Sequence, residues 1–87
     1  MINENLAERA KDDDKLKLGN FPEFVGLGIV PVRKSSREMA VAVYVSRPLA
    51  KLSDLFKVSV PASVVVFDHG SKYSVPTKIV NIGDLRP

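Results

Sequence analysis

An alternation of large and small residues begins at Phe24 and is the clearest pattern in the chain. Over residues 24–32 the large apolar residues point to one face of an expected strand, whereas Gly26 and Gly28 point to the other. Strand interiors normally avoid glycine, because it packs no side chain and loses much backbone entropy on folding. Two glycines on one face therefore predict that another part of the protein lies very close to this strand.

A second alternation runs over residues 39–45, where the bulky residues face one side and Ala40, Ala42 and Tyr44 face the other. The polar segment 32–38 joins this strand to the first one and predicts a β-hairpin. In such a hairpin the alanines and the glycines of the first strand form one smooth patch. We expect a helix to pack on this patch, and a shallow ligand groove is the alternative interpretation.

Helical signals occur in two places. Near the N-terminus, Asn5 is expected to cap a short helix, with Glu8 completing a capping-box pair, and Gly19-Asn20 is a stop signal. After Pro48, apolar residues recur at near-helical spacing and predict one or two helical turns; they are Leu49, Leu52, Leu55 and Phe56.

The last third of the chain predicts a second hairpin. Residues 62–67 are rich in β-branched side chains, residues 68–72 have turn chemistry around Gly70, and a further strand continues to Ile82. Pro76 lies within that strand and has no backbone N–H, so we expect it to mark a strand start or a sheet edge.

Together these elements predict an α+β fold, in which two β-hairpins form a mainly antiparallel sheet with an N-terminal helix and a short linking helix, in two layers. A small all-β barrel is the alternative. Residues 1–20 are expected to form an N-terminal helical segment that packs on a single α+β domain over residues 21–87. Because an open sheet has two free edges, the apolar run Val64–Phe67 makes the second hairpin the expected surface for self-association or for a protein partner.

Composition adds little to this description. The chain has 87 residues and no cysteine, which suits a reducing compartment, so we expect a cytoplasmic protein. Residues 1–20 carry four basic and five acidic side chains (net −1), whereas residues 21–87 carry nine basic and five acidic side chains (net +4). No apolar run approaches the ~20 residues that cross a bilayer, and no membrane partner is expected.

The sequence contains no constellation of residues that is typical of an active site. His69 is the only histidine, so a three-histidine zinc site is impossible, and the neighbouring Asp68 and Ser71 diverge from it on a tight turn rather than forming a triad. The acidic run 12–14 is consecutive, whereas a calcium loop needs alternate acidic positions. We therefore expect no enzyme activity, no catalytic residue, no cofactor and no metal site.

The best candidate for ligand binding is the basic loop between the first two strands, with Arg33, Lys34 and Arg37. Four lysines could add to this site, depending on the fold: Lys51, Lys57, Lys72 and Lys78. A positive excess favours anionic partners, so these residues are candidate contacts for a polyanion such as nucleic acid. A solvated hairpin loop is the alternative, because nucleic-acid readout usually combines basic residues with aromatic ones, and most aromatic residues here lie in apolar runs.

Four short segments also form an ordered pattern: FVGLGI at 24–29, AVAVYV at 40–45, the region around Val60-Pro61, and VPTKIVNIG at 75–83. This pattern resembles the small N-terminal accessory domain that precedes the catalytic unit in some trypsin-like serine peptidases and related uncharacterised proteins. Val30-Pro31 departs from the family pattern, in which a glycine and a basic residue often follow the first strand. The resemblance implies a non-enzymatic accessory or interaction domain with a regulatory role toward a peptidase unit, and it carries no catalytic residue onto this chain.

Overall fold

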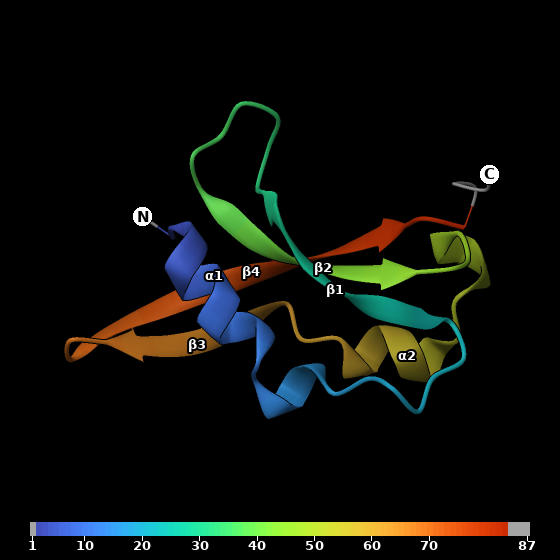
Figure 1. Ribbon diagram of the computed structural model, residues 1–87. Helices are drawn as coiled ribbons and strands as arrows, with labels where there is room; N and C mark the ends of the chain where they lie inside the picture. Colours follow the sequence, from blue (N-terminus) through green and yellow to red (C-terminus); the bar gives the residue numbers. More distant parts are fainter. Residues whose placement is uncertain (1, 84–87) are drawn as a thin grey trace.

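Four strands and two α-helices make up the computed structural model over residues 2–83, which are the residues that the structure describes. In chain order the elements are α1 (Glu4–Lys11), the 3-10 turn η1 (Asp14–Leu16), β1 (Phe24–Pro31), β2 (Met39–Val45), the 3-10 turn η2 (Leu49–Lys51), α2 (Asp54–Ser59), β3 (Ser63–Asp68) and β4 (Ser71–Asn81). The helices lie on one side of an open sheet (Figure 1). The predicted two-layer α+β fold is thus confirmed, and the sheet is not a closed barrel.

The strand order in the sheet is β1-β2-β4-β3. Both hairpins are antiparallel, and they join through a parallel pairing of β2 with β4. β4 uses its first half, Ser71–Pro76, to pair with β3, and its second half, Thr77–Asn81, to pair with β2. β1 and β3 are therefore the two edge strands.

Pro76 lies inside the central strand β4, so the prediction that it marks a strand start or a sheet edge is wrong. The reason is the staggered pairing of β4. Thr77 donates its backbone N–H to Ala62 O at 3.1 Å, on the β3 side, so the nitrogen of the preceding Pro76 faces β2. The β2–β4 pairing begins only at Thr77, and the missing N–H of Pro76 costs the sheet no hydrogen bond there.

The helical layer covers the bulky face of the sheet. α1 packs on all four strands, and Leu6, Ala7 and Ala10 of this helix belong to the same buried cluster as the valines of β2, β3 and β4. Phe56 of α2 joins that cluster and meets the ring of Phe21 edge to face, with ring centroids 5.2 Å apart. The prediction that a helix lies on the glycine–alanine patch is therefore wrong. The bulky face offers more apolar area to remove from water, and the helices bury that face instead.

Two long side chains of the sheet itself lie over part of the glycine–alanine patch. A Cβ atom at Gly28 would lie 2.6 Å from Cε2 of Tyr44, so the tyrosine ring of β2 lies over this glycine. Lys78 of β4 pairs with Ala42 and donates its Nζ to Val32 O at 3.2 Å, beyond β1. Its aliphatic stem therefore crosses β2, a strand whose alanines are completely buried.

The two glycines should respond differently to the same substitution. Gly28→Val places methyl groups against the Tyr44 ring and is expected to lower the free energy of unfolding by about 1–3 kcal/mol. Gly26→Val is the matched control, because no atom lies within 4 Å of a Cβ atom there, and it should leave stability unchanged or raise it. Chemical denaturation of both variants checks this prediction. Equal effects at both positions would show that Tyr44 does not restrict Gly28.

The ends of the helices are fixed by local caps. Asn3, not Asn5, caps α1, and its side-chain oxygen accepts the N–H of Leu6 at 2.9 Å. This earlier start places the first helical turn at Glu4, which suits the positive end of the helix dipole. After Pro48 the predicted helical stretch is divided into η2 and α2, because Ser53 begins a new helix as an N-cap and accepts the N–H of Phe56 at 3.2 Å.

Glu23 is a buried charged residue that supports this second cap. Its carboxylate accepts the N–H of Ser53 at 3.1 Å, and its own backbone carbonyl accepts the N–H of Ser46 at 3.0 Å. Hydrogen bonds from its own N–H and from Ser53, helped by nearby Arg47, lower the pKa of the Glu23 carboxyl. The folded state thus gains stability from Glu23 above the ordinary pKa of a glutamate, and loses it as the pH falls through the lowered value. Glu23 is therefore a structural group.

Candidate functional site

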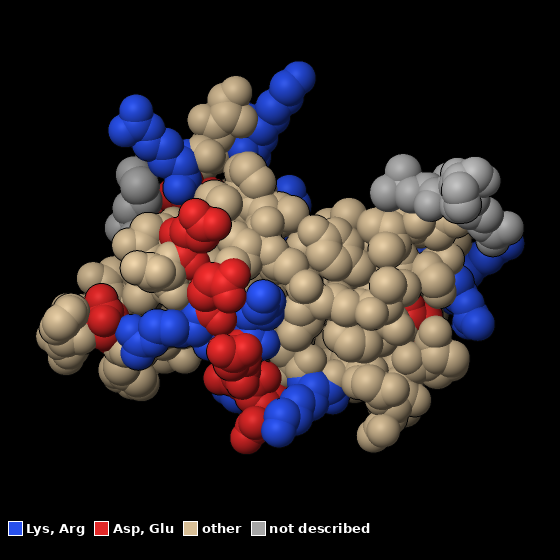
Figure 2. All heavy atoms as spheres, viewed as in Figure 1, with Lys and Arg blue, Asp and Glu red and all other residues tan. Residues whose placement is uncertain are grey.

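The three basic residues singled out in the sequence lie together on the loop between β1 and β2. Arg33, Lys34 and Arg37 are all exposed, and the loop projects from the body of the protein (Figures 1 and 2). Ser36 donates its N–H to Arg33 O at 2.9 Å to close a turn, in which Ser35 has a positive φ of 70°. A shallow hollow of about 260 Å³ lies beside this turn, lined by Arg33, Lys34 and the two serines.

The edge of β3 is the second candidate site. The β3–β4 turn has two central residues, His69 and Gly70, which have φ angles of 50° and 79°, as a type I′ turn requires. The pair that closes such a turn, Asp68 and Ser71, is hydrogen bonded, and hydrogen-bonded pairs alternate along the ladder. The N–H and C=O groups of the odd-numbered residues of β3 therefore point away from β4 toward the free edge; these residues are Ser63, Val65 and Phe67.

β3 also carries apolar side chains beside its free edge. Phe67 is 62% exposed and Val65 is partly exposed, and both point to the face of the sheet that the helices leave open. No residue from Val60 to Phe67 carries a charge. An exposed, uncharged edge strand is a template for pairing with another chain.

The edge of β1 is less suited to such pairing. The N–H of Val32 binds Glu38 O at 2.8 Å, so the alternation of the hairpin turns the nitrogen of Pro31 outward, where it has no hydrogen to donate. At its other end, β1 has an irregularity at Val25, between the pairs formed by Phe24 and Gly26. A proline and a bulge are two of the devices by which proteins protect edge strands.

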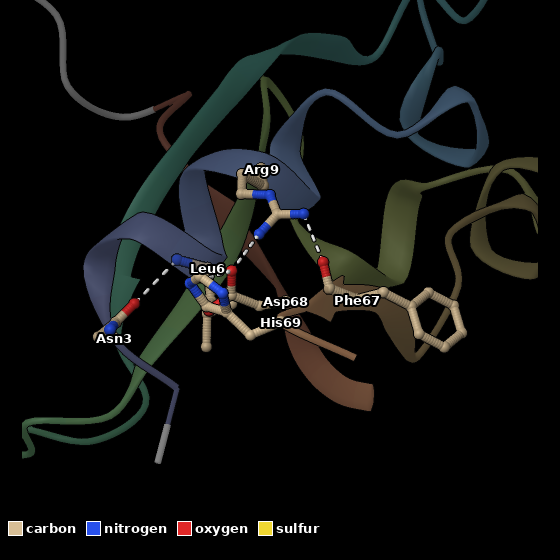
Figure 3. Close-up of polar contacts among 6 residues, drawn as sticks. All are labelled: Asn3, Leu6, Arg9, Phe67, Asp68 and His69. Carbon is tan, nitrogen blue, oxygen red and sulfur yellow. Dashed lines mark hydrogen bonds and ion pairs between the residues drawn. The ribbon is translucent and has the colours of Figure 1, made fainter. Parts of the chain in front are cut away.

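A side chain of α1 contacts the end of β3. Arg9 of α1 donates through Nη2 to the carbonyl of Phe67 and pairs through Nη1 with Asp68 Oδ1 at 3.0 Å (Figure 3). Both charged side chains are substantially exposed, so this ion pair stabilises the fold by only about 0–1 kcal/mol. A hollow of about 330 Å³ lies beside the contact, between the start of α1 and the β3–β4 turn. Arg9 therefore binds the free-edge carbonyl of Phe67 only weakly, and we call this contact the Arg9 cap.

His69 sits at the tip of this turn and points into solvent, with a side chain that is 93% exposed. Its Nε2 lies 3.8 Å from Asp68 Oδ1, which is beyond hydrogen-bonding distance, and Asp68 is engaged by Arg9 instead. Among the described residues, His69 thus has no hydrogen-bonded partner that would orient it as a general base.

The acidic run 12–14 forms part of a capped turn. Asp13 accepts the N–H of Lys15 at 2.8 Å, and Asp14 pairs with Lys17 at 3.2 Å. Among residues 2–83, no group of three or more histidine, aspartate or glutamate side chains is arranged to hold a metal ion. In the same range, no helix is long and apolar enough to cross a membrane.

One feature of the site was not anticipated in the sequence. Arg9 lies 59 positions from Asp68, and nothing in the local pattern links the two residues. Lys78 is one of the lysines that the sequence could add to the basic loop depending on the fold, and it reaches that loop because β4 lies next to β2 in the sheet. The exposed Phe67, in contrast, belongs to the apolar run that the sequence marked as a docking surface.

The chain was compared with family models, with curated proteins and with solved structures, and none of them matches. The resemblance to the accessory domain of trypsin-like peptidases stays a prediction.

Proposed function

We propose that this is a non-enzymatic protein-interaction domain in which the free edge of β3 accepts an extended segment of a partner polypeptide. The observation that carries the proposal is the exposed, uncharged edge at Ser63, Val65 and Phe67. Main-chain hydrogen bonds supply affinity in strand addition, and alternate side chains supply specificity. A partner segment that pairs with β3 continues the four-stranded sheet by one strand.

The chemistry of the edge defines the partner segment. Val65 and Phe67 present apolar surface on the open face, so the matching positions of the partner are apolar at every second residue. Arg9 donates a hydrogen bond to the backbone carbonyl of Phe67. A partner strand therefore either displaces this weak contact or forms main-chain hydrogen bonds only with Ser63 and Val65. The resemblance suggests a peptidase unit as the source of the segment, and a second copy of the chain is the alternative source. A cytoplasmic location remains part of this proposal.

Selection from a displayed library of random linear peptides tests strand addition. Ser63→Pro and Val65→Pro each remove an N–H that points to the free edge and leave the β3–β4 hydrogen bonds in place. Each variant should bind the enriched peptides about tenfold more weakly, because a lost main-chain hydrogen bond costs about 1 kcal/mol and the proline ring blocks close approach of the peptide. Val25→Pro, at the irregular position of β1, is the matched control and should bind as the unchanged chain does.

Two further variants and measurements sharpen the test. Arg9→Ala frees the carbonyl of Phe67 and should bind the same peptides equally well or more tightly. Sedimentation equilibrium at several concentrations identifies a second copy as the partner if dimers form and Val65→Pro abolishes them. Failure to enrich any peptide, or equal binding by the β3 proline variants and the unchanged chain, would refute strand addition at this edge.

A further inference from the structure

The open face of the β1–β2 hairpin differs from the β3 edge in both shape and charge. Most residues of its floor are small, and the alanines among them are completely buried, whereas a Cβ atom at Gly26 would have no atom within 4 Å. The partly exposed ring of Tyr44 stands on this floor over Gly28. The result is a surface on which one aromatic ring lies beside an open glycine position.

Four cations lie at one end of this surface. Lys78 crosses β2 and brings its Nζ to within 3.2 Å of Val32 O, at the base of the basic loop. Arg33, Lys34 and Arg37 project from the loop itself. The loop also contains the exposed Glu38, whose negative charge offsets one of these positive charges. We call Arg33, Lys34, Arg37, Tyr44 and Lys78 the open-face strip.

Acidic side chains gather on the opposite layer. Figure 2 shows them in a column over α1 and the turn that follows it, whereas basic side chains extend from the end of the projecting loop. The acidic residues of α1 and the turn that follows it are Glu4, Glu8, Asp12, Asp13 and Asp14, and the basic residues of the same segment are Arg9, Lys11, Lys15 and Lys17. No strand residue that points to the open face is acidic; these residues are Gly26, Gly28, Val30, Ala40, Ala42, Tyr44, Ser63, Val65, Phe67, Lys72, Ser74, Pro76, Lys78 and Val80. The charged strand residues of the open face, Lys72 and Lys78, are both positive, which favours an anion there.

We propose that the open-face strip binds single-stranded nucleic acid, with phosphates on the four cations and a base stacked on Tyr44. The hollow of about 260 Å³ beside Arg33 and Lys34, with the hydroxyls of Ser35 and Ser36 in its lining, receives one phosphate group. A flat sheet with an aromatic ring beside basic residues suits an unpaired strand, because its bases are free to stack on the ring. This site does not use the β3 edge.

Fluorescence anisotropy with a labelled oligothymidylate of about 15 nucleotides tests the proposal, since this length matches the site sizes of single-strand binding domains. The triple variant R33A/K34A/R37A should weaken binding at low salt by about tenfold or more. The control K11A/K15A/K17A removes the same number of charges from α1 and the turn that follows it, and it should bind as the unchanged chain does. For four phosphate contacts, the slope of log K against log salt should be about −3.

Changes at Tyr44 separate stacking from charge. Tyr44→Leu should lower the affinity for the oligothymidylate by about fivefold or more, whereas Tyr44→Phe keeps the ring and should bind with unchanged affinity. Circular dichroism and thermal unfolding establish that each variant is folded. Equal losses in the two triple variants, heparin or duplex DNA binding as tightly as the single strand, or no binding of the single strand at low salt would each overturn the proposal.

Discussion

Replacement of Phe56 by alanine is expected to lower the free energy of unfolding by about 3–5 kcal/mol, close to the whole stability of a small domain. Phe56 is completely buried, lies on the short helix α2, and packs edge to face on Phe21. Its removal leaves a cavity at the end of the core where α2 and the segment before β1 meet. Urea denaturation followed by circular dichroism measures the loss.

Phe67→Ala is the matched control for this change. The same atoms are removed, but Phe67 is 62% exposed and lies on the open face, so the expected change is only about 0.5 kcal/mol. The melting temperature should fall by more than about 10 °C for Phe56→Ala and by a few degrees at most for Phe67→Ala. Similar losses for the two variants would contradict the burial that the structure assigns to α2.

Replacement of Leu6 by alanine is expected to cost about 2–5 kcal/mol and to loosen α1 from the sheet. Leu6 is 4% exposed and belongs to the core cluster that α1 shares with β2, β3 and β4. A helix of eight residues is too short to persist in water without such packing. Loss of the helix also removes the Arg9 cap from the carbonyl of Phe67.

Leu55→Ala provides the control for Leu6→Ala. Leu55 is 66% exposed on α2, and its truncation should change stability by about 0.5 kcal/mol or less. Amide exchange distinguishes local from global effects, because Leu6→Ala should speed exchange in α1 more than in the β2–β4 pairing. Uniform acceleration across the sheet would show that α1 and the sheet unfold as one unit.

Strand patterns were the part of the fold that the sequence predicted well. Alternation over residues 39–45 corresponds to β2 residue for residue, and Gly70 marks the turn between β3 and β4. Such patterns are local, because each strand must place its large residues on one face. The position of the helical layer is not local, since it depends on which face of the assembled sheet offers more apolar area.

The same distinction separates the two candidate surfaces. The basic loop and the apolar run of β3 are each one continuous stretch of sequence, so both could be identified from the sequence alone. Three other features depend on strand order and tertiary packing. They are the outward-facing nitrogen of Pro31 at the β1 edge, the contact of Arg9 with Phe67 O, and the contact of Lys78 with Val32 O. Strand order rests on the parallel pairing of β2 with β4, for which the separate hairpins carry no sequence signal.

Hydrogen exchange at β3 tests the free-edge proposal most directly. In the protein alone, the amides of Val64 and Val66 should exchange slowly, because they belong to the β3–β4 ladder, whereas those of Val65 and Phe67 should exchange fast. A selected peptide should protect the amide of Val65 strongly and leave Leu27, on the β1 edge, unchanged. Protection gained at Leu27 instead, or no protection gained at Val65, would contradict strand addition at β3.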